Sequence, residues 1–331
     1  MSVTDIDLSP TRPLCRKAAS HWSSLNARIC PGASGWIGSA VVPELMGAGH
    51  QVTGLARSDA SAAALIAAGA GVHRGTLDDL DILRSAAAAS DGVIHLAFKH
   101  DIAFSGDFQG AADADRRAVE TFGEALAGTD RPFLIASGML GIAPGRVATE
   151  RDEPAAHFEG GLQARQATAQ LTVSLASRGV RSSVVRLPPT VHGQGDNGFM
   201  AFLVGIARDK GVSGYIAEGT NRWPAVHLLD AARLFRLALE TAPAGSVLHA
   251  NAEEGVPIRA IAEVIGRHLN LPIAAISPEH AAAHFSWLAG FLGVDSPASS
   301  TVTRELLGWQ PTHPGLLDDL DQGHYFHNPS A

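Results

Sequence analysis

A glycine-rich turn near the start of the chain constrains the fold more than any other feature. The run Gly32-Ala33-Ser34-Gly35-Trp36-Ile37-Gly38 follows a short strand candidate at 26–30 and opens a helical stretch that Gly49 ends. The first glycine permits a tight turn, the second lets the backbone approach a phosphate, and the third lets helix and strand pack closely. The N–H groups and the positive dipole end at the helix start attract anions. The turn therefore predicts a dinucleotide site.

Short β-rich runs alternate with longer helical runs after this turn. Strands are expected at 26–30, 50–56, 71–74, 92–97, 131–136 and 182–186, and helices at 36–48, 61–68, 79–89, 113–127 and 163–177. Such alternation implies parallel pairing, right-handed crossovers and helices on both faces of one sheet. We predict an α/β fold built on a doubly wound parallel Rossmann sheet.

The alternation of predicted strands and helices ends at Pro188-Pro189. Glycine and proline become frequent, and helices are expected at 199–209, 230–241, 258–269 and 278–291, with short apolar pieces at 214–217 and 247–250. We expect residues 26–190 to form the dinucleotide-binding domain and 191–331 a smaller, mostly helical substrate lobe interleaved with the last sheet strands. Residues 1–25 are expected to be a disordered extension or a consequence of start-site choice.

Composition excludes several classes of protein. Of 331 residues 46% are hydrophobic, which suffices for a sizeable core, and the net charge of −8 disfavours a nucleic-acid-binding surface. No apolar run approaches the roughly 18 residues of a membrane span. The two cysteines, Cys15 and Cys30, are too few for a disulfide framework or a four-thiolate zinc site. A reducing, cytoplasmic setting is the simplest interpretation.

The end of the second expected strand favours one nucleotide over the other. Arg57 lies 19 residues after Gly38 and is followed by Ser58. Dinucleotide-binding folds place the group that contacts the adenosine ribose ~20 residues after the glycine turn. An acidic residue there would bind the ribose 2′-hydroxyl and repel a 2′-phosphate, whereas a guanidinium pairs with phosphate oxygens. The pattern favours NADP, with NAD as the alternative and a solvated arginine as the structural explanation.

Four segments together resemble a known family. GASGWIG, HLAF, RLPPTVHG and WPAVHLLDAARLF are similar to motifs of the extended short-chain dehydrogenases/reductases, the NAD(P)-dependent epimerase/dehydratase-like proteins. The resemblance spans roughly residues 26–325. It implies a Rossmann domain, a C-terminal substrate lobe with the cleft between them, and a homodimer. The implied cofactor contacts are Gly32, Ser34, Gly35, Trp36, Ile37, Gly38, Arg57, Ser58, Leu77, Leu96, Ala97, Phe98, Arg165, Pro188, Thr190 and Val191.

The chain departs from the family pattern where the chemistry is done. The family's YxxxK motif is absent, and alignment puts Gly161 at the tyrosine and Arg165 at the lysine. The tyrosine normally exchanges the hydroxyl proton, and general acid–base help of this kind contributes about 10²–10⁴ in rate. The residue before the turn is Pro31 where the family has threonine, and Thr76 stands where an acidic residue is usual near adenine. The resemblance is thus to an atypical branch.

Four side chains are candidates for the missing proton-transfer role. Lys99 and His100 follow the fourth strand in an expected loop at the carboxyl edge of the sheet, where open α/β folds bind ligands. Partial burial would lower the pKa of Lys99, and His100 titrates near neutrality. Ser137 ends the fifth strand, and His192 follows the sixth. Each also has a structural explanation: an exposed loop pair, a strand-end hydroxyl and a packed histidine.

Other chemistries are less favoured. His280 and His284 share a helical face but lack a HExxH glutamate and a third ligand, so no metal site is predicted. GxSxG and GxxxxGK[ST] are absent, which disfavours α/β-hydrolases and P-loop nucleotidases. The leading hypothesis is an NADP-dependent oxidoreductase acting on a small carbonyl or hydroxyl compound. A sugar epimerase or dehydratase and a non-catalytic dinucleotide sensor are the alternatives. By the resemblance, Arg222, Trp223 and His227 lie where the family reaches its substrate, although a tryptophan such as Trp223 is more often part of the core than a substrate contact.

Overall fold

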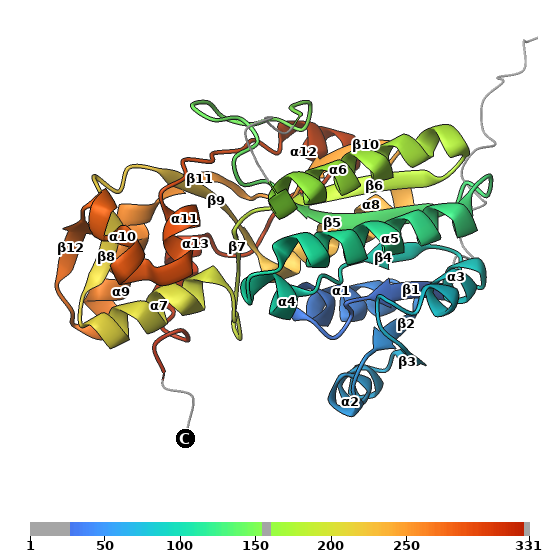
Figure 1. Cartoon of the computed structure of the whole chain (residues 1–331), viewed down its shortest axis with the longest axis horizontal. Helices are drawn as coiled ribbons and strands as arrows, with labels where there is room; N and C mark the ends of the chain where they lie inside the picture. The colour runs from blue at the N-terminus through green and yellow to red at the C-terminus, as the bar shows by residue number, and fades with distance from the viewer. Residues whose placement is uncertain (1–26, 154–159, 328–331) are drawn as a thin grey trace, which may run out of the picture.

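A computed structural model describes residues 27–153 and 160–327, and its first half alternates strand and helix as predicted (Figure 1). The expected extension at 1–25 lies outside the described residues. The strands are β1 (Ala27–Pro31), β2 (Gln51–Ala56), β3 (Gly71–Arg74), β4 (Val93–His95), β5 (Pro132–Gly138) and β6 (Arg181–Leu187). The helices are α1 (Trp36–Gly47), α2 (Asp59–Ala67), α3 (Leu80–Ala88), α4 (His100–Phe104), α5 (Phe108–Leu126), α6 (Gly160–Ser174) and the 3-10 turn η1 (Leu175–Arg178).

One seven-stranded sheet organises this half, in the order β10-β6-β5-β4-β1-β2-β3. Every pairing within it is parallel. The switch in strand order lies between β1 and β4, and open α/β sheets bind ligands outside the carboxyl ends of the strands at such a point. The predicted α/β, doubly wound Rossmann sheet is confirmed.

Two apolar layers cover the sheet. On one face α1 and α8 pack on Cys30, Leu134 and Val185. On the other face α3, α5 and α6 pack on Ile29 and Phe133, and Figure 1 shows α5 and α6 in front of the strands. Because both faces are covered, the strands present apolar side chains in both directions.

The rest of the chain builds a second lobe and also returns to the main sheet. Its helices are α7 (Phe199–Lys210), α8 (Leu228–Thr241), α9 (Ile258–Leu269), α10 (Pro278–Phe285), the 3-10 turn η2 (Ser286–Leu288), α11 (Ala289–Leu292), α12 (Thr301–Leu307) and α13 (Leu316–Asp321). Its strands are β7 (Thr190–His192), β8 (Ser213–Ile216), β9 (Arg222–His227), β10 (Ser246–His249), β11 (Glu253–Pro257) and β12 (Ile273–Ile276). β10 joins the main sheet, while β11-β9-β7 and β12-β8 form two small sheets.

Several expected elements differ in kind or extent. The segment expected as a loop after β4 contains α4, with Lys99 at its N-cap. The helix expected over 278–291 is interrupted at Ser286, whose φ of 54° lies in the left-handed region. β9 was not expected because it contains Pro224, which is unusual inside a strand. These are positions where tertiary contacts override local propensity.

The helices of the described part of the chain differ from those that span a bilayer. Within residues 27–153 and 160–327, none combines the length and the apolar character needed to cross one.

Candidate functional site

The glycine turn leaves the start of α1 open. Gly32 has a φ of 88°, and a Cβ built on it would lie 2.5 Å from the backbone nitrogen of Ala97. A Cβ on Gly38 would lie 2.3 Å from the carbonyl oxygen of Gly32. Gly35 is the N-cap of α1, no side chain caps the helix, and its first turn carries no acidic residue. Turn and helix start therefore have the close packing and the exposed N–H groups that a pyrophosphate requires.

The surroundings of this turn are fixed by long-range contacts. The carbonyl oxygen of Pro31 accepts a hydrogen bond from the Leu96 amide at 2.9 Å, so this departure from the family pattern lies inside the sheet. The indole Nε1 of Trp36 donates to the carbonyl oxygen of Val191 at 2.9 Å. The turn is thus joined both to the end of β4 and to β7, the two segments that the resemblance assigns to the cofactor.

At the expected adenosine end, Arg57 is exposed and paired. Its Nη1 donates to Oδ2 of Asp101, a residue of α4, at 2.9 Å, and the side chains expose 67% and 57% of their areas. This hydrogen bond lowers the pKa of Asp101. Ser58 is the N-cap of α2, and its hydroxyl accepts from the Ser61 amide. Leu77 is buried in the core beside α3.

Lys99 is tied to a carboxylate on the same side of the sheet. Its Nζ donates to both carboxylate oxygens of Asp78, at 2.6 and 2.8 Å. Asp78 precedes α3, so the pair connects the start of α4 to the segment after β3. Together with the Arg57–Asp101 pair, it holds α4 between the two segments beside the expected adenosine end.

His100 and Arg165 lie together around one aromatic ring. The guanidinium of Arg165 stacks over Phe98 at 4.0 Å from the ring centroid, and the rings of Phe98 and His100 are 5.1 Å apart, edge to face. Nη2 of Arg165 also donates to the carbonyl oxygen of Ala136 at 3.0 Å. Partial burial lowers the pKa of His100, and the charge of Arg165 lowers it further. Arg165, which the resemblance aligns with the family's lysine, therefore lies at the carboxyl edge of β4 and β5, beside an imidazole.

The end of β5 carries a buried hydroxyl next to open space. Ser137 is 4% exposed, and its Oγ has no hydrogen-bond partner within the described residues. The next residue, Gly138, is exposed, and a Cβ built on it would meet nothing within 4 Å. The position after Ser137 therefore carries no side chain, and no described residue fills the space beside it.

His192 is held by the C-terminal segment instead of facing an opening. Its side chain is fully buried, and its Nδ1 is hydrogen-bonded to Oδ2 of Asp319 at 3.0 Å. Asp319 also contacts Nε2 of His324 at 3.1 Å. Burial opposes ionisation of Asp319, but hydrogen bonds with the two histidines outweigh it and hold the pKa of the carboxyl below its usual 3.8. Pro188 and Thr190 are buried beside this segment, and the Thr190 hydroxyl donates to the carbonyl oxygen of Pro224 at 2.5 Å.

We expect Asp319→Ala to destabilise the protein by about 2 kcal/mol at pH 7, because it leaves two partly or fully buried imidazoles without their partner. The depressed folded-state pKa means that the carboxylate stabilises the fold above its unfolded pKa and loses this effect as pH falls through the lower folded value. Urea unfolding at pH 7 and in acid measures both the loss of stability and its dependence on pH. The exposed neighbour Asp318→Ala is the control, and equal free energies of unfolding for the two variants would contradict the expectation.

The second lobe places the other sequence candidates in packing roles. Trp223 is fully buried, Arg222 is paired with Asp295 at 3.0 Å, and the His227 side chain caps α8 by accepting from the Leu229 amide. Trp223 thus belongs to the core of the second lobe, the role that the sequence favoured over substrate contact.

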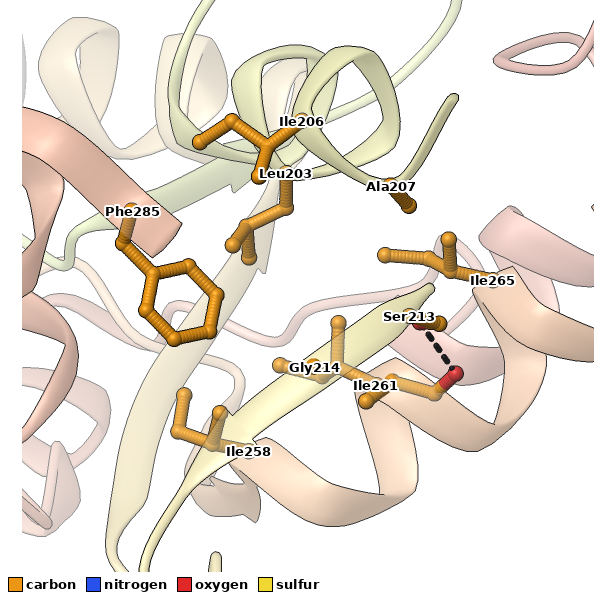
Figure 2. A pocket seen from close by; sticks show the side chains of 10 residues that line it. Leu203, Ile206, Ala207, Ser213, Gly214, Ile258, Ile261, Ile265 and Phe285 are labelled. Atoms are coloured by element: carbon orange, nitrogen blue, oxygen red, sulfur yellow. Dashed lines mark hydrogen bonds between the residues drawn. The ribbon is translucent and has the colours of Figure 1, made fainter. Parts of the chain in front are cut away.

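An apolar cavity also lies in this lobe, away from the turn at Gly32. Figure 2 shows Leu203, Ile261 and Phe285 pointing into it, and Ser213 donates its hydroxyl proton to the carbonyl oxygen of Ala262 at 2.7 Å. With its one hydroxyl already bonded, the cavity offers no group for proton transfer. His280 is bonded to Ser277, and no cluster of three metal-ligating side chains occurs in the described residues.

Sequence reasoning missed the carboxylates that hold this site. Asp101 and Asp78 pair with Arg57 and Lys99. Asp115 on α5 contacts Nε2 of His95 at 2.9 Å, with both side chains buried. Burial opposes ionisation of Asp115, but the hydrogen bond with His95 and the charge of Arg165 hold its pKa below the usual value. For Asp115 the sequence did carry a signal, because an acidic residue stands there at an otherwise apolar position of a helix.

Comparisons with known proteins decide the family. A model described as the NAD dependent epimerase/dehydratase family matches residues 31–250. The chain belongs to this family. The resemblance to extended short-chain dehydrogenases/reductases is therefore confirmed. Two uncharacterized proteins are similar over nearly their whole length: one from Schizosaccharomyces pombe, 48% identical over 89% of this chain and 98% of its own, and one from Saccharomyces cerevisiae, 46% identical over 87% and 96%.

Solved structures of the epimerase/dehydratase fold superpose on most of the chain. A dTDP-glucose 4,6-dehydratase from Streptomyces venezuelae with NAD bound has a TM-score of 0.71 at 17% identity, covering 91% of this chain and 97% of its own. A UDP-glucose 4-epimerase from Thermotoga maritima has a TM-score of 0.71 at 18% identity, covering 91% and 98%. At such identities the likeness concerns the fold.

Proposed function

We propose that this member of the epimerase/dehydratase family is an NADP-dependent oxidoreductase that reduces or oxidises a small carbonyl or hydroxyl compound. The observation that carries the proposal is the open start of α1 behind a turn in which Gly32 and Gly38 leave no room for a Cβ. A nicotinamide dinucleotide is the cofactor that the family description names and that this turn fits.

Residues of this chain would hold the cofactor along the carboxyl edge of the sheet. The N–H groups at the start of α1 would bind its pyrophosphate, Arg57 its adenosine ribose phosphate, and the segment from Leu96 to Phe98 its central part. When bound, the cofactor supplies or accepts the hydride. The protein then has to provide only the proton and the orientation of the substrate.

The proton-transfer group that the geometry favours is His100. Lys99 is held by Asp78, His192 is fully buried against Asp319, and Ser137 is buried with only a hydroxyl to offer. His100 lies at the carboxyl edge beside Arg165, and its protonated imidazole can give a proton to a substrate oxygen. Arg165 is a permanent cation that can orient a carbonyl oxygen but is a poor proton donor.

A direct test combines binding with turnover. NADPH and NADH are titrated by fluorescence, and the absorbance of the bound reduced cofactor is then followed with a panel of ketones, aldehydes and quinones. Binding followed by oxidation of the cofactor supports the proposal. Binding without turnover over the whole panel would favour a dinucleotide sensor, and failure of both nucleotides to bind would overturn the redox role.

Arg57 is expected to decide between the two nucleotides. Arg57→Ala should weaken NADPH binding by about 10- to 100-fold, since a charge-assisted contact to phosphate contributes roughly 1.5–3 kcal/mol, and leave NADH binding nearly unchanged. Asp101→Asn should strengthen NADPH binding a few-fold, because an exposed ion pair of at most about 1 kcal/mol no longer competes for the guanidinium. Fluorescence titration measures both dissociation constants.

The matched control for charge removal is Arg116→Ala, on the exposed face of α5 and paired with Glu120. It should leave both affinities unchanged. An equal loss of NADPH and NADH affinity in Arg57→Ala would argue against a 2′-phosphate contact.

A further inference from the structure

Aromatic side chains of the second lobe gather on one surface. Only 6% of the chain is aromatic, yet Phe199, Phe202, Trp223, Trp287 and Phe291 form one connected group with ring centroids 5.3–6.1 Å apart. Trp223 is buried beneath the others, whereas Phe202 and Trp287 expose 44% and 39% of their surfaces. We name the outer four, Phe199, Phe202, Trp287 and Phe291, the aromatic patch. Contiguous exposed patches of large apolar side chains commonly mark ligand-binding or interaction sites.

One end of the patch adjoins the nucleotide turn. α7 begins at Phe199, directly after a loop that follows β7, and a Cβ on Gly195 of that loop would lie 3.7 Å from the indole ring of Trp36. Trp36 is the first residue of α1. The chain therefore passes within a few residues from β7, which is bonded to Trp36, to the start of α7 (Figure 1).

The other end is tied to the carboxyl end of β5. Ser296, five residues after Phe291, donates its hydroxyl proton to the carbonyl oxygen of Met139 at 3.2 Å and accepts from the Gly141 amide at 2.9 Å. Leu140, between these two, packs against the same apolar core as Phe199 and Phe291. The exposed Gly138 lies just before this loop. The segment that follows the patch thus reaches the end of β5, the strand whose Ala136 carbonyl oxygen accepts from Arg165.

Nearly all the lysine and arginine side chains of the second lobe interact with oxygen atoms of the protein itself. Between residues 191 and 327, seven of the eight lysine and arginine side chains contact a carboxylate or a carbonyl oxygen: Arg208, Lys210, Arg222, Arg236, Arg259, Arg267 and Arg304. The eighth, Arg233, is on α8, which packs against α1 on the far layer of the main sheet. A substrate carrying a diphosphate would need such cations, because its charge must be compensated on binding.

We propose that the aromatic patch binds the body of the substrate, and that this substrate is an uncharged, flat, apolar carbonyl compound such as an aromatic aldehyde or a quinone, not a nucleotide sugar. The inference rests on the oxidoreductase function proposed above. Stacking on Trp287 and Phe202 would hold the ring system, and the carbonyl group would point toward His100 and Arg165.

The test uses the full chain loaded with NADPH, with 1-naphthaldehyde and dTDP-glucose as probes. Trp287→Ala and Phe202→Ala should each raise the KM for 1-naphthaldehyde about tenfold, since each removes a large apolar contact, and leave the NADPH dissociation constant unchanged. Leu306→Ala is the matched control, because it removes an apolar side chain of 46% exposure on α12, outside the patch. Calorimetry with NADP⁺ in place of NADPH measures probe binding without turnover.

Each outcome decides the inference. Tight 1-naphthaldehyde binding that both patch variants weaken, and the control does not, supports it. Three results would overturn it while the oxidoreductase proposal stands. These are tighter binding of dTDP-glucose than of 1-naphthaldehyde, no binding of 1-naphthaldehyde to the cofactor complex, and equal KM values in the patch and control variants. If neither NADPH nor NADP⁺ binds, the proposed function itself fails, and this is seen in the cofactor titration before any probe is added.

Discussion

Gly32→Ala is expected to destabilise the fold by about 3–5 kcal/mol and to abolish nucleotide binding. The φ of 88° at Gly32 penalises any L side chain, and the added methyl would lie 2.5 Å from the backbone nitrogen and 2.6 Å from the backbone carbon that join Leu96 and Ala97. Backbone that directly follows two neighbouring parallel strands cannot move aside cheaply, so the strain is shared by the ends of β1 and β4. Urea unfolding and NADPH titration measure the two effects.

Two further glycine variants separate binding from folding. Gly35→Ala meets only the Gly32 carbonyl oxygen, at 3.2 Å, so the fold should survive while the methyl group obstructs the approach of phosphate to the start of α1. Gly47→Ala, at the other end of the same helix, meets nothing within 4 Å and should leave binding intact. Wild-type affinity for NADPH in Gly35→Ala would place the nucleotide elsewhere.

His100→Gln is expected to lower kcat for carbonyl reduction by about 10²–10⁴, the usual contribution of a general acid, with NADPH affinity unchanged. Reduction needs the protonated imidazole. Because the pKa of His100 is lowered from 6.5, the protonated form is scarce at neutral pH, so the rate should rise as pH falls through the lowered value. Steady-state kinetics across pH 5–8, roughly the range in which histidine titrates, measures this rise, which forms the limb of the pH–rate profile.

The pH profile distinguishes a chemical role from a structural one. Arg165→Gln removes a positive charge beside His100 and should move the limb to higher pH, whereas Arg165→Lys keeps the charge and should move it little. Lys99→Gln, which alters the ion pair with Asp78 on the adenosine side, is the control. If kcat of His100→Gln equals that of the wild type, the proton comes from another group, and Ser137 is then the next candidate to vary.

Some helices and strands could be predicted from the sequence and others could not. β3 and α9 have the bounds that the pattern predicted, because a short β-rich run and a strongly amphipathic helix are local signals. The elements that the pattern did not predict include α4, β9 and the break at Ser286, as well as β7, β11, β12, α12 and α13. A five-residue helix has no period to detect, and Pro224 contradicts a strand. The left-handed φ of Ser286 has no local sequence signal, and the next residue, Trp287, packs against Phe199, which is far away in the sequence.

The residues of the candidate site also fall into those that the sequence could predict and those whose role only the tertiary structure shows. Gly32, Gly35, Gly38 and Arg57 were found because turn, helix start and strand end lie within one short stretch of sequence. Whether Lys99, His100 or His192 could move a proton depended on Asp78, Arg165 and Asp319, which are 21, 65 and 127 residues away.

The sequence by itself determined the family, the Rossmann sheet and the place where a nucleotide would meet the first helix, because these depend on glycine geometry and on periodicity between near neighbours. Only the tertiary structure decided which polar side chains are committed to ion pairs and which stand at the open edge, and it alone brought the aromatic side chains of α7, η2 and α11 together. Such contacts are set by how distant segments pack, since the pairing energy of charges and rings depends on distance in space and not on separation along the chain.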